Sequence, residues 1–336
     1  MLRLVLLLLG LLTLTGLVWH IGPTRIVEAV AELGPLALLA ILLPSLVMYL
    51  LEAYGWRLTL GAHTRTTSYG RLLAIRTAGE VFNMTTPTGY VGGEPLKAYL
   101  LKRQGVPLVD GLASVVVAKT VMTIAQLLFI LLGVGLGLWI LGAPGSGAWF
   151  GLVALVSLGL LAFGVVGFLI IQRRGLFTGL LNVLRYVRVR IRYLEQREEK
   201  LGELDRTILR FYTEQQGTFL LATGFFFLGW LAEAVEVYVI LYFLGVPVGI
   251  LASISIGALS VFIKGSTFFI PGSLGAQEGG NLALLLAFGY TDLTGITFAL
   301  LRRVRELVWI LLGLLCLWAL GGGLSAAQPG QGNSPT

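Results

Sequence analysis

The chain has 336 residues, of which 56% are hydrophobic and only 12% are charged. A water-soluble domain carries about a quarter charged residues, so this composition excludes a soluble globular protein and indicates an integral membrane protein. The formal net charge is +7, and one cysteine and two distant histidines give no basis for a disulfide, a zinc site or a haem. We therefore predict no cofactor, no metal and no nucleic-acid partner.

Apolar stretches that can cross a hydrocarbon core of about 30 Å recur along the chain. The first follows Met1-Leu2-Arg3 and reaches Trp19 without the cleavage site of a signal peptide, so we expect it to be retained. Together they predict an all-α polytopic protein with a single transmembrane domain over residues 1–320. The predicted crossing helices span residues 2–19, 35–58, 108–140, 148–172, 217–244 and 294–320.

Two further apolar stretches, residues 71–104 and 250–289, are interrupted near their middle. Proline removes a backbone donor and glycine loosens a helix, so neither stretch is expected to run as one straight span. Broken helices at membrane depth persist only inside the protein or along a water-filled cavity, and we therefore predict two re-entrant helical hairpins. The expected hinge residues are Pro87, Gly89, Pro271, Gly272 and Gly275.

The distribution of positive charge predicts the orientation. Residues 172–210 contain ten Arg or Lys residues and five acids. The positive-inside rule places the linker 173–216 in the cytoplasm, and counting crossings puts both termini there, in a bacterial-type inner membrane. Apolar residues at helical spacing in this linker, such as Leu181 and Leu204, indicate an amphipathic helix lying on the membrane. The polar tail 321–336 is expected to be disordered.

The chain contains an internal repeat. When the sequence is aligned with itself at the offset that separates Pro87 from Pro271, the units 35–140 and 217–320 match without a gap. One unit runs crossing helix, hairpin, crossing helix, and the helix 148–172 joins the two. From the start of one unit to the start of the next, the chain crosses the membrane three times. Because this number is odd, the two units are predicted to have opposite orientation, as in many alternating-access transporters. The matched residues include Pro87 with Pro271, Glu94 with Glu278, Lys119 with Arg303, and Glu52 with Glu236.

Charged residues interrupt the apolar segments. Because a charge at mid-bilayer costs roughly 2.5–3.5 kcal/mol, these residues are expected to pair, to lie near an interface or to line a wet cavity. The seven acids and five bases of this set allow either a cationic headgroup held by glutamates or an anionic headgroup held by Arg and Lys. The set comprises Glu52, Glu80, Glu94, Lys119, Glu233, Glu236, Lys264, Glu278, Arg302, Arg303, Arg305 and Glu306.

Several of these charges have a structural interpretation beside a functional one. Glu94 precedes Pro95 and is expected either to cap a helix or to hold a headgroup. Lys119 and Arg303 are expected either to pair with Glu278 and Glu94 across the two-fold axis or to bind a phosphate.

Other charges suggest pairs within the protein or a proton relay. Glu80 and Lys264 carry opposite charge at the repeat offset and are expected to pair, as are Arg302 and Glu306, which lie four residues apart on one helix. The acids Glu233 and Glu236 share a helix face, as a proton relay needs. The residues expected to bind substrate are Glu52, Glu94, Lys119, Glu236, Glu278, Arg302 and Arg303.

Four stretches, namely Gly92–Lys97, Ala113–Lys119, Pro271–Glu278 and Ala299–Arg303, carry a family resemblance. Up to about residue 320 the chain resembles the lysylphosphatidylglycerol synthase transmembrane region, also called the flippase-like or UPF0104 family. In multidomain members this region precedes a cytoplasmic aminoacyl-transferase domain and is associated with flipping the aminoacylated lipid. The resemblance implies lipid translocation, and we expect a stand-alone member that is not an enzyme.

The resulting hypothesis is a flippase that moves a phospholipid or a lipid-linked headgroup through a headgroup-sized polar cavity near the midplane. Its expected partners are membrane lipids, with a lipid-synthesis enzyme as a further candidate. A proton-coupled transporter of a small soluble solute fits the paired acids and the inverted repeat equally well. An accessory subunit of a lipid-modifying enzyme is a third alternative. The sequence leaves the headgroup, the direction, the energy source and the oligomeric state open.

Overall fold

Every regular element that the computed structural model describes is a helix, and the chain is an all-α polytopic membrane protein, as predicted. The structure describes residues 22–85, 92–141, 175–186, 198–267, 270 and 273–322, together with short pieces within 15–19 and 159–172. The helices are α2 (Pro23–Leu58), η1 (Gly61–Arg65), α3 (Tyr69–Thr85), α4 (Glu94–Lys102), α5 (Leu108–Leu141), α7 (Leu176–Tyr186), α9 (Glu198–Glu214), α10 (Gln216–Phe243), α11 (Ile250–Ser266), α12 (Ala276–Ala287) and α13 (Asp292–Gly322).

Four of the described helices are long and apolar enough to cross a membrane, at Gly34–Leu58, Leu108–Ile140, Gln216–Phe243 and Asp292–Gly321. Their bounds agree closely with four of the predicted crossing helices. The other two predicted crossings, 2–19 and 148–172, fall largely outside the described residues, so the number six stays a prediction.

In each interrupted stretch the described residues form two separate helices, as the proline and glycine content predicted. In the first, α3 ends at Thr85 and α4 begins at Glu94; in the second, α11 ends at Ser266 and α12 begins at Ala276. Of the predicted hinge residues, Gly275 is the N-cap of α12 and has a φ of 76°, a left-handed value that suits glycine. The other predicted hinge residues, Pro87, Gly89, Pro271 and Gly272, lie outside the described residues.

The helix bounds repeat at the offset found in the sequence. Helix α5 begins at Leu108 and α13 at Asp292, and this is the same spacing that separates Pro87 from Pro271. The turns before the two helices also match, because Gly105 and Gly289 have φ values of 93° and 84°. The residues after these glycines donate backbone hydrogen bonds in the same pattern, from Val106 to Leu101 and from Tyr290 to Leu285.

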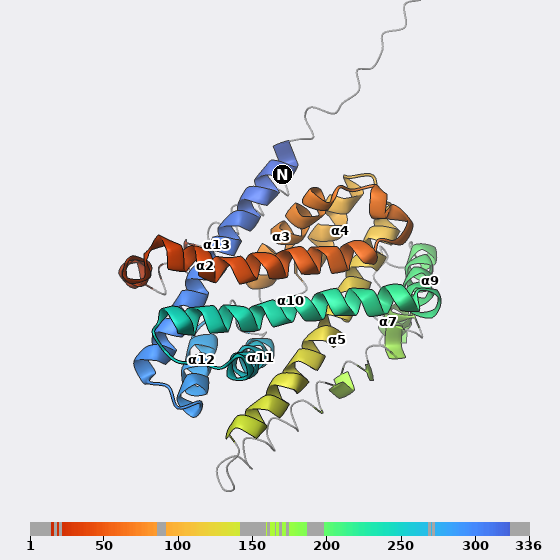
Figure 1. Cartoon of the computed structure of the whole chain (residues 1–336). Helices are drawn as coiled ribbons and strands as arrows, with labels where there is room; N and C mark the ends of the chain where they lie inside the picture. Colours follow the sequence, from red (N-terminus) through yellow and green to blue (C-terminus); the bar gives the residue numbers. More distant parts are fainter. Residues whose placement is uncertain are drawn as a thin grey trace, which may run out of the picture.

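The two units also pack in a reciprocal way. Helices α2 and α10, the first of each unit, lie side by side and run in opposite directions (Figure 1), while α3 packs on α13 and α11 packs on α5. Consistently, a side chain at Gly55 would contact Phe226 and one at Gly229 would contact Glu52. This exchange of partners is what a two-fold relation predicts; the inverted and re-entrant arrangement in the membrane stays a prediction.

The linker helix α9 has the amphipathic pattern expected of it, but its apolar face is covered by protein. Leu204, Ile208 and Phe211 are buried in one core with residues of α5 and α10. The prediction that this face lies on the membrane is therefore wrong for α9, because α5 offers an apolar surface beside it. Asp205 of the same helix accepts hydrogen bonds from the first amides of α7 and fixes the two helices together.

Candidate functional site

A network of charged side chains occupies the interior of the described helices. The structure adds Arg76 and Lys97 to the predicted set, which raises its five bases to seven and equals its seven acids. Within the described residues, every one of these charges makes an ion pair, and each pair joins two residues of the same unit. Arg76 and Lys97 both lie in the interrupted stretch 71–104, and from this stretch the predicted set included only acids.

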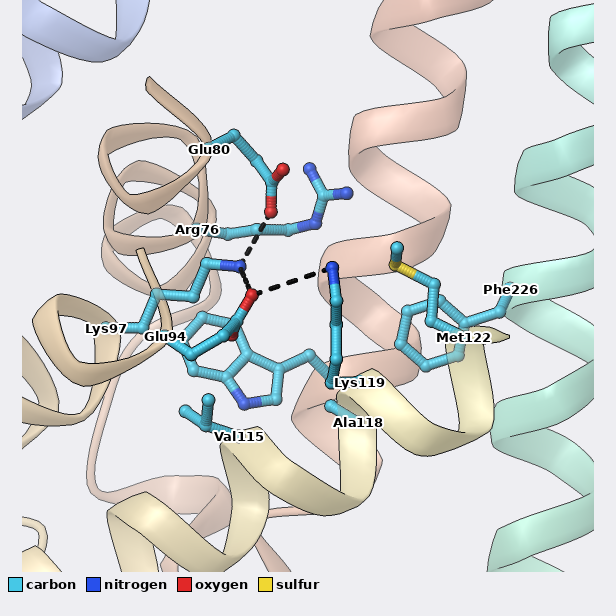
Figure 2. Close-up of a pocket in the computed structure, with 10 residues that line it drawn as sticks. Arg76, Glu80, Glu94, Lys97, Val115, Ala118, Lys119, Met122 and Phe226 are labelled. Atoms are coloured by element: carbon cyan, nitrogen blue, oxygen red, sulfur yellow. Dashed lines mark hydrogen bonds and ion pairs between the residues drawn. The ribbon is translucent and has the colours of Figure 1, made fainter. Parts of the chain in front are cut away.

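In the first unit the network centres on Glu94 at the start of α4 (Figure 2). Its Oε1 accepts hydrogen bonds from Asn83 Nδ2 and Lys97 Nζ, both at 3.0 Å, and lies 3.8 Å from Lys119 Nζ. Lys97 Nζ also donates to Glu80 Oε1 at 2.6 Å. Helices α3, α4 and α5 thus contribute to one cluster that holds two of the three predicted site residues of this unit, Glu94 and Lys119.

The local fold brings α3 and α4 unusually close. The side-chain oxygen of Asn83 accepts a hydrogen bond from the backbone N–H of Gly93 at 2.8 Å. A Cβ atom at Gly93 would overlap the carbonyl oxygen of Gly79, so only glycine fits there. Gly93 is also the N-cap of α4, and Glu94 is the first helical residue. The expectation that Glu94 is itself the cap is therefore wrong by one position, and its carboxylate is available to the cluster.

Glu52 of α2 joins this network through an ion pair with Arg76 of α3. The guanidinium of Arg76 also lies over the ring of Tyr49, 4.6 Å from its centroid. Tyr49 in turn stacks on Trp309 of α13 at 3.7 Å, and the Trp309 indole donates to Ser45 Oγ at 2.9 Å. These contacts connect the first unit to the last helix of the second.

In the second unit Arg303 is fully engaged. Its guanidinium forms a fork on Glu278, with Nε 2.5 Å from Oε1 and Nη2 3.1 Å from Oε2. It also donates to Glu306 at 2.6 Å and to the carbonyl of Ser273 at 3.1 Å. Glu306 accepts a further hydrogen bond from Lys264 at 2.6 Å. The predicted site residues Glu278 and Arg303 therefore bind each other, and the guanidinium of Arg303 is occupied by acceptors of the protein.

The remaining charges of the second unit are almost completely buried. Arg305 Nη1 donates to Glu236 Oε2 at 2.5 Å and to Glu233 Oε2 at 3.2 Å. Arg302 pairs with Glu233 and lies 3.9 Å from Glu236. Glu233 and Glu236 do share a face, as predicted, but two arginines neutralise them.

The predicted pairing across the two-fold axis is wrong. Lys119 pairs with Glu94 and Arg303 with Glu278, each within its own unit, instead of Lys119 with Glu278 and Arg303 with Glu94. The reason is that α4 packs on α5 and α12 packs on α13, so the glutamate after each break meets the cation of the next helix in the same unit.

Two other predicted pairs are also wrong. Glu80 and Lys264 pair with partners in their own units rather than with each other. Arg302 contacts Glu233 of α10 and not Glu306, because its side chain points to the neighbouring helix instead of along its own.

A cavity of about 20 Å³ opens beside the first network. It has room for about one water molecule, so the headgroup-sized cavity that we predicted is larger than the one the structure describes. Residues of helices α2, α3, α4, α5 and α10 line the cavity. The lining residues are Trp56, Arg76, Glu80, Glu94, Lys97, Val115, Ala118, Lys119, Met122 and Phe226.

Comparison with known proteins decides the family. The sequence model described as "Lysylphosphatidylglycerol synthase TM region" matches residues 1–314. The chain belongs to this family. A protein of Methanothermobacter thermautotrophicus that is described as a UPF0104 membrane protein is 23% identical over 98% of this chain and 96% of its own length. The family name connects this protein with membrane lipids.

Proposed function

We propose that the protein translocates a phospholipid or a lipid-linked headgroup across the inner membrane, without a chemical step of its own. The observation that carries the proposal is the charge-balanced network at the two helix breaks. Ionisable residues are costly at membrane depth and commonly mark a substrate path. Here the network is neutral by itself, with three acids and three bases in the first unit and four of each in the second.

A neutral network suits a charged headgroup. When a headgroup enters, it can take the place of one member of an ion pair, so that no unpaired charge is left behind. Lys119 is the best placed to exchange partners, because its side chain is 25% exposed and its ion pair with Glu94 is long, at 3.8 Å. Glu278 is 33% exposed and is the corresponding point of entry in the second unit.

The helix arrangement supports alternating access as the mode of transport. The first helices of the two units run antiparallel, and each unit packs its second helix against the last helix of the other. Inverted repeats with broken helices near the midplane commonly place their substrate site at the interface between the repeats. In this proposal the cytoplasmic side holds α7, α9 and both termini.

A reconstitution experiment tests the proposal. Purified protein is placed in liposomes with tail-labelled fluorescent phospholipids, and a membrane-impermeant reductant bleaches the accessible label. We expect bleaching well beyond the outer-leaflet half for the wild type, and slower bleaching for Glu94→Gln and Glu278→Gln. The matched control is Glu199→Gln on the exposed face of α9, which should behave as wild type.

Absence of flipping for several headgroups, with folded and correctly inserted protein, would contradict the proposal. An accessory role beside a lipid-modifying enzyme would then be the better interpretation. A proton-coupled transporter of soluble solutes has lost its specific support, because Arg302 and Arg305 neutralise the acids Glu233 and Glu236 that suggested a proton relay.

A further inference from the structure

We propose that the cavity of the first unit is an anion site that binds the phosphate group of a lipid. This inference rests on the proposed function and selects the substrate class that the sequence left open. It depends on an excess of hydrogen-bond donors around the cavity, on the engagement of the neighbouring carboxylates, and on a difference between the two units.

Three donors at the cavity have little or nothing to bind. The indole N–H of Trp56 and the Nη1 of Arg76 are buried, and neither has an acceptor among the described residues. Lys119 Nζ has one carboxylate oxygen in reach, at 3.8 Å, which is longer than a hydrogen bond. Buried donors are almost always satisfied in proteins, so unsatisfied donors that line a cavity point to an acceptor ligand.

One oxygen of each carboxylate beside the cavity, the Oε1 of Glu80 and of Glu94, is engaged with donors of the protein. Glu94 accepts from Asn83 and Lys97, and Glu80 accepts from the same two side chains. Figure 2 shows the amino groups of Lys97 and Lys119 and the guanidinium of Arg76 gathered around these two acids. A cationic headgroup would compete with the three cations that the protein already supplies at the cavity, whereas an anion can accept from Trp56, Arg76 and Lys119.

The shape of the cavity favours a phosphate ester over a free ion. The donors without acceptors lie on α2, α3 and α5, and Val115, Ala118, Met122 and Phe226 add apolar surface to the lining beside its other charged residues. A phosphodiester presents its charged oxygens on one side and its ester carbons on the other. A cavity of about 20 Å³ admits one oxygen atom, and the partly exposed Lys119 has to swing outward to admit the whole phosphate.

The second unit lacks the same arrangement at the equivalent positions. At the repeat offset, Arg76 corresponds to Ser260 and Lys97 to Asn281, so two cations are replaced by neutral side chains. The counterpart of Lys119 is Arg303, which already donates to two carboxylates and a carbonyl. The anion site therefore belongs to the first unit.

Arginine N–H groups without acceptors also occur in the second unit, on Arg302 and Arg305. These two side chains lie against Glu233 and Glu236, and they are absent from the lining of the cavity. Their positive charge is thus offset by acids in direct contact, which distinguishes them from Lys119.

Equilibrium binding measured by calorimetry tests this assignment on the full-length protein in detergent. The probes are a short-chain phosphatidylglycerol, inorganic phosphate, and a short-chain cationic lipid that has no phosphate. We expect Lys119→Gln to weaken phosphatidylglycerol binding about 10-fold or more, and Trp56→Phe, which keeps the ring and removes the N–H, by about 3-fold or more. Lys119→Arg should retain binding, and the exposed Lys102→Gln is the matched control.

Each outcome decides a part of the inference. Equal binding by Lys119→Gln and Lys102→Gln, or a preference for the cationic lipid, would overturn the anion site. Inorganic phosphate that binds as tightly as the lipid would uphold the anion site and overturn its assignment to a lipid. Flipping without phosphate-dependent binding would refute this inference alone, whereas phosphate-dependent binding without flipping would refute only the proposed function. Trp56→Phe keeps the test informative if Lys119→Gln fails to fold.

Discussion

Removal of Glu236 tests whether the buried network stabilises the fold through charge balance. The residue is fully buried, and its Oε2 lies 2.5 Å from Arg305 Nη1. Breaking a buried ion pair by removing one partner costs about 3–5 kcal/mol, since the other charge remains buried. Arg305 keeps Glu233 at 3.2 Å, so we expect Glu236→Gln to lower the free energy of unfolding by about 3 kcal/mol, at the lower end of that range.

The double variant gives the sharper result. Removing Glu236 and Arg305 together, with Arg305→Met, leaves Arg302 paired with Glu233, and the charges balance again. Residues in one ion-pair network couple by about 0.5–3 kcal/mol, so the double variant should lose less stability than the two single variants summed.

The assay is equilibrium unfolding of purified protein in mixed micelles with a rising fraction of denaturing detergent, followed by far-ultraviolet circular dichroism. Glu199→Gln, on the exposed face of α9, serves as the control and should change stability by less than about 0.5 kcal/mol. If Glu236→Gln costs no more than this control, or if the double variant is additive within about 0.5 kcal/mol, then charge balance does not explain the network.

Three further predictions concern close contacts between helices. Gly93→Ala would overlap the carbonyl of Gly79 and should cost about 1–3 kcal/mol in the same unfolding assay, whereas Gly70→Ala, in open space on α3, should be neutral or stabilising. Gly133→Ala would overlap a side chain of α11 and should cost a similar amount; an unchanged midpoint would refute that contact. Asp205→Ala removes the acceptor of the first amides of α7, so we expect a loss of about 1 kcal/mol and faster hydrogen exchange at those amides, and unchanged exchange would argue against the cap.

The sequence determined the membrane class, the bounds of four crossing helices, both interruptions and the family. These features depend on local properties: the length of an apolar run is fixed by the thickness of the hydrocarbon core, and clustered proline and glycine disfavour a continuous helix. The repeat offset was also visible in the chain, because matching helices and turns require matching residues at both places.

Only the tertiary structure decided which charges meet. The sequence paired Lys119 and Arg303 with glutamates of the opposite unit, but the packing of α4 on α5 and of α12 on α13 pairs each with its own. The sequence also did not predict that Lys119 makes only one long ion pair, whereas Arg303 donates to two carboxylates and a carbonyl. Ion pairing depends on distances of a few ångströms between helices far apart in the chain, and those distances follow from close contacts such as that of Gly93 with Gly79, which no local pattern specifies.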